Sequence, residues 1–426
     1  MKITNARLRD RDGLYDVTID SGYFVAITPT ATTHSDTSGE ALASRAPDDI
    51  DAGGALLCPP FVDAHLHLDY ANTVGQPRLN ETGTLFEAID IWAEHKAQGY
   101  VNHDTVLANA LDAVRAEVSN GVGFIRTHVD VTDPDLTAVN ALLELRDQVR
   151  DWCHIQIIAF PQNGITAYPH GDKLLEESLR RGVDTVGGIP HFEGTREAGI
   201  ESLRIVFELA ERYGKLVDVH CDEIDDGHSR FLEVMAEETT RRGMQGRVTA
   251  SHAVAMAYYG PGYMAKLLPK LATADMRFAV NTTENLHLQG WGASAPMPRG
   301  VAPIRTLTEA GLNVAFGQDS IADPWYPIGE GDLLRILETS LHVGHMLNES
   351  YLRHCLDFIT TNGARNMGIA GDYGIDVGKP AHAILLDATD DKNALWHHAD
   401  VLANIHHGNV VFTRARRTYT RTIPGF

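Results

Sequence analysis

The sequence predicts an α/β protein in which a TIM-type (β/α)8 barrel is inserted into a small β-sandwich domain formed by both chain ends. Two observations predict this fold. Between about residue 58 and about residue 370, short β-branched segments alternate with longer helical segments about eight times, which is typical of a parallel barrel. The two ends of the chain contain short strand-like segments instead, so they resemble each other and differ from the middle.

The strand-like segments of the two chain ends are residues 1–8, 14–29, 381–388 and 401–417. Residues 30–50 are small and polar and predict a surface loop. We therefore expect a small domain made of residues 1–57 and 374–426, with residues 58–373 forming the barrel.

The first barrel strand is expected in the segment FVDAHLHLD. The strands predicted after it are 121–131, 154–160, 183–192, 215–226, 247–253, 277–283 and 312–319. Four of them are followed by predicted helices, at 135–152, 171–182, 199–214 and 228–243. An open doubly wound sheet is the alternative, but no GxGxxG or GxxxxGK[ST] motif follows the first strand, so nothing supports a nucleotide-binding site.

Composition excludes several classes of partner. The 426 residues carry a formal net charge of −21, which argues against nucleic acid or an anionic membrane surface. The four cysteines are far apart in the sequence, which favours free thiols in a reducing compartment. We recognise no signal peptide and no apolar segment of about 18 residues. A cytoplasmic location is therefore expected.

Two histidines, His65 and His67, lie two residues apart in an apolar segment. Residues i and i+2 of a strand point to the same face, whereas a metal-binding pair on a helix needs a spacing of three or four. The pair can therefore share a metal ion only if this segment is a strand. The alternative is a pair of core or interface histidines.

Polar residues near the ends of later strands favour the metal site. They are His128, Asp130, Gln162, His220, Glu223, His252 and Asp319. In a TIM-type barrel the carboxyl ends of all strands face one site. Imidazole nitrogens with one carboxylate suit Zn²⁺ or Fe²⁺. The expected ligands are His65, His67, His220 and Asp319.

This arrangement resembles the amidohydrolase superfamily, with HxH on the first strand, histidines on the fifth and sixth, and an aspartate on the eighth. Longer segments resemble its bacterial cytosine deaminase branch. They are PPFVDAHLHLDYANTVGQPRLNETGTLFEAI, IAFPQNG, IPHFEGTRE, VDVHCDEIDD, VTASHAVAM, NLHLQG and DPWYPIG, and they extend over most of the chain. The resemblance implies hydrolytic deamination of a small aminopyrimidine by one divalent metal ion, Zn or Fe. The fourth-strand segment VDTVGGIPHFE lacks the lysine that bridges two metals in some relatives, so a single ion is expected.

The resemblance also implies residue roles. Glu223 is the expected proton carrier, His252 orients the attacking water, and the ligand Asp319 belongs to the same catalytic group. Gln162 is expected to bind the lactam edge of the ring, because its amide is both donor and acceptor. Trp325 is expected either to form an apolar wall beside the substrate ring or to be a packed aromatic residue.

The chain departs from the family at the end of the eighth strand. Cytosine deaminases have a Gly-His-Asp-Asp segment, whereas this chain has Gly-Gln-Asp-Ser, with Gln318 and Ser320 at the changed positions. Because serine is smaller than aspartate and uncharged, we expect Ser320 to admit a 5-substituent, as in 5-methylcytosine deaminase-like members. His128 and His191 are expected to be supporting or structural groups.

Other functions remain alternatives. Creatinine, isocytosine and s-triazine deaminases have broadly similar sites, and a hydantoinase-like cyclic-amide hydrolase is less favoured because the bridging lysine is missing. A non-catalytic binding protein is not expected to keep every ligand and Glu223. By resemblance, the protein is also expected to form a homo-oligomer.

Overall fold

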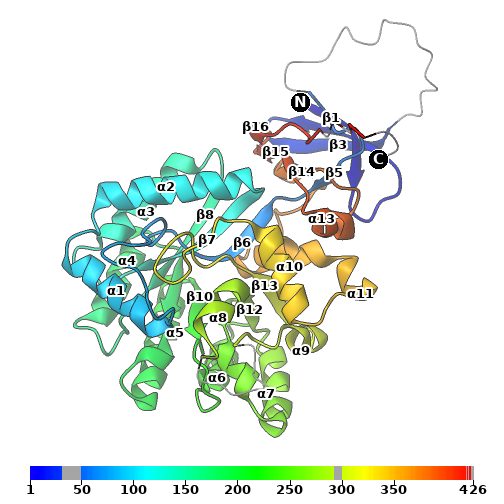
Figure 1. The fold of residues 1–426 in the computed structure, drawn as a ribbon. Coiled ribbons are helices and arrows are strands. Elements are labelled where there is room, and N and C mark those ends of the chain that lie inside the picture. Colours follow the sequence, from blue (N-terminus) through cyan, green and yellow to red (C-terminus); the bar gives the residue numbers. More distant parts are fainter. Residues whose placement is uncertain (31–48, 292–299, 419, 421, 424–426) are drawn as a thin grey trace, which may run out of the picture.

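The computed structural model describes residues 1–30, 49–291, 300–418, 420, 422 and 423. A surface loop is predicted at 30–50. Apart from residues 30, 49 and 50, it lies outside these described residues. The strands form two sheets, a barrel and a smaller terminal sheet beside it (Figure 1). Among the described residues, no helix combines the length and apolar character needed to cross a membrane.

The barrel sheet contains eight parallel strands in sequence order, as predicted. They are β6 (Phe61–His67), β7 (Val122–Asp130), β8 (His154–Phe160), β9 (Thr185–Gly188), β10 (Leu216–Cys221), β11 (Val248–His252), β12 (Arg277–Val280) and β13 (Asn313–Phe316). Backbone hydrogen bonds close the ring between the first strand and the residues after the last. The N–H of His67 donates to the carbonyl of Asp319 at 2.9 Å, and the N–H of Asp319 donates to His65 at 2.8 Å. The predicted TIM-type barrel is confirmed.

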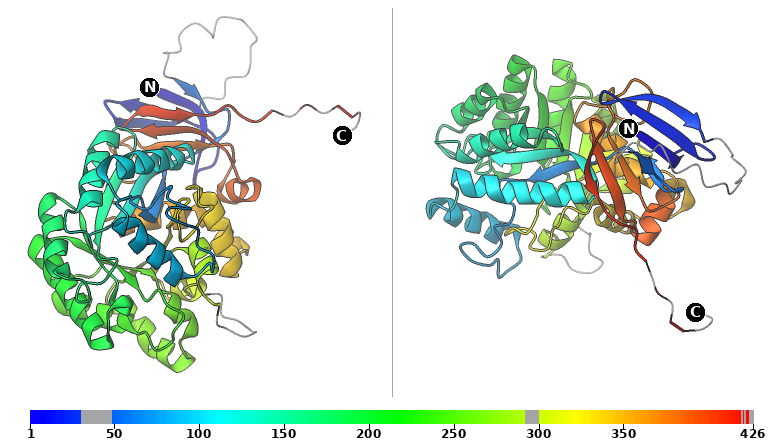
Figure 2. Two further views of the ribbon diagram at one scale, coloured as in Figure 1. Left: turned by 60° about the vertical axis from the view of Figure 1, so that its left-hand side comes forward. Right: turned by 90° about the horizontal axis from the view of Figure 1, so that it is seen from above.

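Helices surround this barrel, as the two views of Figure 2 show. The α-helices are α1 (Leu85–Ala97), α2 (His103–Ser119), α3 (Thr137–Val149), α4 (Gly171–Arg181), α5 (Arg196–Tyr213), α6 (Phe231–Arg242), α7 (Pro261–Thr273), α8 (Thr282–Leu288), α9 (Ile304–Glu309), α10 (Leu333–Val343), α11 (Glu349–Leu352) and α12 (Thr361–Asn366). Short 3₁₀ turns are η1 (Pro190–Phe192), η2 (Val254–Tyr258) and η3 (Cys355–Ile359). Helix α5 begins three residues before the predicted start, because the Thr195 side chain accepts from the N–H of Ala198 and caps it.

The terminal sheet combines both ends of the chain. Its strands are β1 (Lys2–Leu8), β2 (Tyr15–Asp20), β3 (Tyr23–Pro29), β4 (Ile50–Asp51), β5 (Leu56–Cys58), β14 (Ala383–Leu386), β15 (Val401–His406) and β16 (Asn409–Thr413), with helix α13 (Asp391–His397) between β14 and β15. The order is β16-β15-β14-β5-β1-β2-β3, and β4 pairs with β1. The insertion of the barrel into a terminal β domain is therefore confirmed. The boundaries at 57 and 373 stay a prediction, and Cys58 still belongs to the terminal sheet.

Candidate active site

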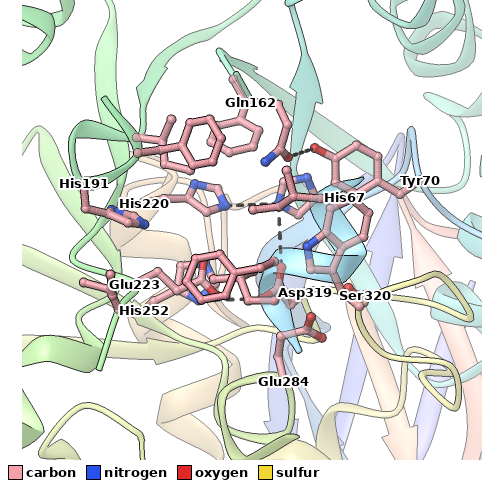
Figure 3. Close-up of a pocket in the computed structure, with 18 residues that line it drawn as sticks. His67, Tyr70, Gln162, His191, His220, Glu223, His252, Glu284, Asp319 and Ser320 are labelled. Atoms are coloured by element: carbon pink, nitrogen blue, oxygen red, sulfur yellow. Dashed lines mark hydrogen bonds and ion pairs between the residues drawn. The ribbon is translucent and has the colours of Figure 1, made fainter. Parts of the chain in front are cut away.

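A pocket of about 620 Å³ opens at the carboxyl ends of the barrel strands (Figure 3). Eight of the nine predicted site residues line it: His67, Gln162, His220, Glu223, His252, Asp319, Ser320 and Trp325. The ninth, His65, is fully buried beside Asp319. The barrel thus brings together residues that are up to 260 positions apart in the sequence, because parallel strands end on the same side.

The four predicted metal ligands lie close together. The Nε2 atoms of His67 and His220 are 3.2 Å apart. Oδ1 of Asp319 lies 3.3 Å from Nε2 of His65 and 3.6 Å from Nε2 of His67. Ligand atoms about 2.0–2.1 Å from one tetrahedral ion are separated by about 3.4 Å, so these distances match a shared coordination shell.

These imidazoles are neutral, as metal ligands must be. Burial lowers the pKa of His67 to about 3, although the charge of Asp319 opposes the shift. Burial also lowers the pKa values of His65 and His220 well below the ordinary value. Nε2 of His65 has no hydrogen-bond partner among the described residues, although it is fully buried. The donor set and this unpartnered nitrogen fit a divalent ion.

A chain of buried groups fixes the orientation of His65. The Ser251 hydroxyl donates to Asp218 at 2.6 Å, so it must accept from the Nδ1–H of His65 at 2.9 Å. Asp218 in turn pairs with Arg126, 2.9 Å away. This arrangement leaves the lone pair of Nε2 directed at Asp319, which is how supporting residues fix a ligand tautomer. His128 also approaches, with Nε2 3.1 Å from Nδ1 of His65, and supports the ligand from behind.

Glu223 and His252 lie together on the side of the pocket opposite Tyr70 and Ser320 (Figure 3). Oε1 of Glu223 is 3.4 Å from Nδ1 of His252, whose distance to Oδ2 of Asp319 is 3.7 Å. Burial raises the pKa of Glu223 well above its ordinary value, and the charge of Asp319 adds to this effect. Asn285 on α8 donates to Glu223 at 3.3 Å. A buried carboxyl group whose pKa is raised in this way suits proton transfer.

Two residues of the site have strained backbone conformations. His252 has a φ of 68° and Asp319 a φ of 70°, both in the left-handed region that non-glycine residues rarely adopt. Each lies where its strand has just ended, so the chain turns over the pocket at these two points. Such strain clusters at functional sites, where the surrounding structure holds it in place.

The aromatic wall of the pocket is a stack of three rings. The centroid of the Tyr70 ring lies 4.6 Å from that of His67 on one side and 4.6 Å from that of Trp325 on the other, and the Tyr70 ring is nearly parallel to both. Trp325 therefore lines the pocket and is a packed aromatic as well. The Tyr70 hydroxyl donates to Oε1 of Gln162, so the amide N–H groups of Gln162 remain for a substrate carbonyl.

Ser320 faces the pocket, whereas the neighbouring Gln318 does not line it. The Gln318 side chain donates to the Ser320 carbonyl at 3.0 Å and accepts from Gly331 at 3.1 Å, so it fixes the loop behind the pocket. Gly329 approaches the same carbonyl so closely that an added Cβ would lie 1.9 Å from it. His191, on η1, also lines the pocket, and its side chain hydrogen-bonds the backbone of His220.

The sequence singled out neither Tyr70 nor Glu284, which line the pocket, nor Asn285, which donates to Glu223. Glu284 is buried and lines the pocket next to Ser320, and its pKa is raised well above the ordinary value, first by burial and then by the charge of Asp319. The position of the segment NTTEN, directly after the seventh barrel strand, could have indicated Glu284 and Asn285. Polar residues directly after a barrel strand face the catalytic mouth.

The family comparison decides the classification. A model of the amidohydrolase family matches residues 48–412, which is most of the chain. The chain belongs to the amidohydrolase family. It is therefore an enzyme, a hydrolase that acts on carbon–nitrogen bonds, as the sequence predicted.

Individual relatives of this amidohydrolase are also informative. A 5-methylcytosine deaminase from Klebsiella pneumoniae, solved with 5-fluorocytosine, is 45% identical, superimposes with a TM-score of 0.94 and covers 99% of each chain. N-isopropylammelide isopropylaminohydrolase from Burkholderia multivorans is 26% identical, with a TM-score of 0.80 over 96% of this chain and 97% of its own. N-isopropylammelide isopropyl amidohydrolase from Pseudomonas sp. (strain ADP) is 30% identical over 96% of both chains. The predicted resemblance to the cytosine deaminase branch is confirmed.

Proposed function

We propose that this amidohydrolase deaminates a small aminopyrimidine, cytosine or 5-methylcytosine, with 5-methylcytosine the better substrate. Water adds to the ring carbon that bears the amino group, and ammonia leaves, giving uracil or thymine. The observation that carries this proposal is the 45% identity over 99% of the chain to a 5-methylcytosine deaminase. The pocket of this chain also contains Gln162, Glu223 and Ser320, which suit such a substrate.

One divalent ion, Zn²⁺ or Fe²⁺, is proposed to bind His65, His67, His220 and Asp319. The three neutral imidazoles and the carboxylate are the ligand types that both ions accept. When bound, the ion supplies Lewis-acid activation of water near neutral pH.

Glu223 is the proposed proton carrier. In its protonated form it donates to the ring nitrogen as the water oxygen bonds to the ring carbon. It then takes the two protons of the added water in turn: the first passes to the amino group, which leaves as ammonia, and the second restores the protonated carboxyl group. His252 contacts Glu223 and Asp319, so it is placed to orient the attacking water.

Three groups are proposed to hold the ring. Gln162 donates its amide N–H to the substrate carbonyl, because Tyr70 already occupies its oxygen. Trp325 and Tyr70 provide the flat apolar wall. Ser320 leaves space for the 5-methyl group where an aspartate would crowd it.

The test is ammonia release by zinc- or iron-loaded enzyme on cytosine, 5-methylcytosine, isocytosine and creatinine in parallel. We expect 5-methylcytosine to match or exceed cytosine, and removal of the metal by a chelator to abolish turnover. Glu223→Gln is expected to lower kcat on every substrate about 10²–10⁴-fold, the range typical of a lost general acid–base. If the enzyme turned over cytosine but not 5-methylcytosine, the proposal that Ser320 admits the 5-methyl group would be refuted.

A second candidate is removal of an amine from an s-triazine ring. The 30% identity to N-isopropylammelide isopropyl amidohydrolase over nearly the whole chain favours it. N-isopropylammelide added to the same assay separates the two, because release of isopropylamine without activity on pyrimidines would support the triazine reaction instead.

A further inference from the structure

Three histidines gather at the far side of the barrel from the active site. They are His382, just before β14, and His406 and His407, at the turn between β15 and β16. One ring nitrogen from each lies within 4.8 Å of the other two. The rings of His382 and His406 also contact Phe124, with centroids 5.2 and 6.3 Å away.

The position of Phe124 separates this cluster from the catalytic pocket. Phe124 is near the start of β7, and the His128 that supports the active site is four residues further along the same strand. Four residues of strand extend over about 13 Å. The cluster therefore lies where the terminal sheet meets the amino ends of the barrel strands, with β15 and β16 beside the end of α2 (Figure 1).

The backbone holds the three imidazoles together. His407 and Gly408 form a two-residue hairpin turn, with φ values of 46° and 77°, between the paired residues His406 and Asn409. The N–H of Gly408 donates to the carbonyl of Ala381 at 2.9 Å. This bond ties the turn directly to the residue before His382, so the relative placement of the cluster is built into the sheet.

Two nitrogens of the cluster face each other inside the protein. Nδ1 of His382 and Nδ1 of His406 are 3.1 Å apart, and both side chains are buried. The backbone N–H of His407 also donates to Nδ1 of His382 at 3.3 Å, so that nitrogen carries no proton, and an ion bound to its lone pair would replace this long hydrogen bond. Lone-pair nitrogens of imidazole are the ligands that zinc-class ions prefer, and the spacing is close to the roughly 3.4 Å between ligands of one tetrahedral ion.

We propose that His382, His406 and His407 form a second metal site, a structural one, for a divalent transition ion such as Zn²⁺. His407 is exposed, so an ion reaches the cluster from solvent and this imidazole can rotate to meet it. The bound ion cross-links β14 to the β15–β16 hairpin beside the barrel. At the amino-terminal face of a TIM-type barrel, such a site serves stability and not catalysis.

The test counts zinc in chelator-stripped, reloaded and desalted protein by mass spectrometry. The informative variant is His407→Asn, because asparagine followed by Gly408 is the preferred sequence for this positive-φ turn, so the fold is kept while the ligand is lost. His397→Ala is the matched control, because it removes an exposed histidine of α13 that belongs to no such cluster among the described residues.

We expect the unmodified chain and His397→Ala to hold one zinc ion more per chain than His407→Asn. Zinc is also expected to raise the thermal midpoint of the stripped unmodified chain more than that of His407→Asn. Equal zinc content in the unmodified chain and His407→Asn, or the same loss in His397→Ala, would overturn the proposal. The difference of one ion is independent of deaminase activity and of whether the catalytic site fills, because both variants keep that site.

Discussion

Ser320 lies on the pocket wall close to two buried acids, Glu284 and Asp323. Burial raises the pKa of Asp323 to about 7 and that of Glu284 well above its ordinary value, and the Ser320 hydroxyl opposes both shifts. A third carboxyl group at this point would fill the space next to the ring and add charge to a crowded acidic cluster. We therefore propose that substrate preference depends on Ser320.

We predict that Ser320→Asp lowers kcat/KM on 5-methylcytosine about 10–200-fold relative to cytosine, the range that one methyl group in a pocket can provide. The measurement is the ratio of the two kcat/KM values. Ser320→Ala serves as the control, because it removes the hydroxyl without adding bulk and should keep the ratio. An unchanged ratio in Ser320→Asp would show that the 5-position is accommodated elsewhere.

The four proposed metal ligands were predictable because of where they lie along the barrel. His65, His67 and His220 lie near the carboxyl ends of strands and Asp319 follows one, so the barrel pattern alone indicates that they converge. Tyr70 lies in the loop after β6, and its contacts with Gln162 and Trp325 depend on how three distant loops pack. His382 and His406 were missed for the same reason, since no motif spacing connects them.

At the scale of single elements, the approach of β13 to the proposed metal ligand His65 depends on Gly317. A Cβ added there would lie 2.7 Å from both Cβ and the carbonyl oxygen of His65. Strand β13 can therefore approach the first strand, and position Asp319, only with glycine at this residue.

We predict that Gly317→Ala lowers the free energy of unfolding by about 1–3 kcal/mol, the usual effect of overpacking, and reduces bound metal at the catalytic site. Denaturant unfolding and metal analysis measure the two effects. Gly262→Ala on α7 is the control, because its Cβ meets open space and alanine is favoured in a helix by about 1 kcal/mol. Full metal content in Gly317→Ala would contradict this account of the strand.

A second element-scale contact joins α13 to α10. Nε2 of His398 lies 2.7 Å from Asp332, which caps the amino end of α10. The hydrogen bond to Asp332 raises the pKa of His398 above its ordinary 6.5, despite partial burial. A raised folded-state pKa means that the stabilisation is complete below about pH 6.5 and is lost as pH rises through the folded pKa.

We therefore predict that His398→Asn, which suits the positive φ of 48°, destabilises the protein more at pH 5.5 than at pH 8.5. Because His398 is about two-fifths exposed, the difference should stay within about 1 kcal/mol. Urea midpoints at the two pH values measure it. An effect of equal size at both pH values would mean that the charge of His398 contributes nothing.

At the scale of the whole molecule, Arg9 links the terminal domain to the barrel through Asp357. It follows β1 and makes a bidentate contact with Asp391 on α13, at 2.8 and 2.7 Å, and a further bond to Asp357 on η3 at 2.8 Å. The side chains of Arg9 and Asp391 are largely buried, so loss of the arginine leaves a buried carboxylate without its partner.

We predict that Arg9→Ala costs about 3–5 kcal/mol of unfolding free energy, as expected when one partner of a buried ion pair is removed. Arg11→Ala is the matched control, since Arg11 reaches the exposed Asp376 only at 3.8 Å and should contribute less than about 1 kcal/mol. The midpoints of chemical unfolding of the two variants measure the difference. Equal midpoints would show that Arg9 does not hold the domains together.

The architecture itself was readable from the sequence because strand–helix alternation is a long-range pattern that local errors do not destroy. Element ends were less predictable. The segment 183–192 forms only the short strand Thr185–Gly188, because Pro190 begins a 3₁₀ turn and cannot continue a strand. Homo-oligomer formation and a cytoplasmic location stay predictions.

The most direct test of the central claim is product analysis after metal-loaded enzyme acts on 5-methylcytosine in ¹⁸O-labelled water. The account predicts thymine carrying one ¹⁸O atom, together with an equal amount of ammonia, and no product from Glu223→Gln on the same timescale. A ring-opened product, or no ammonia from either pyrimidine, would contradict it.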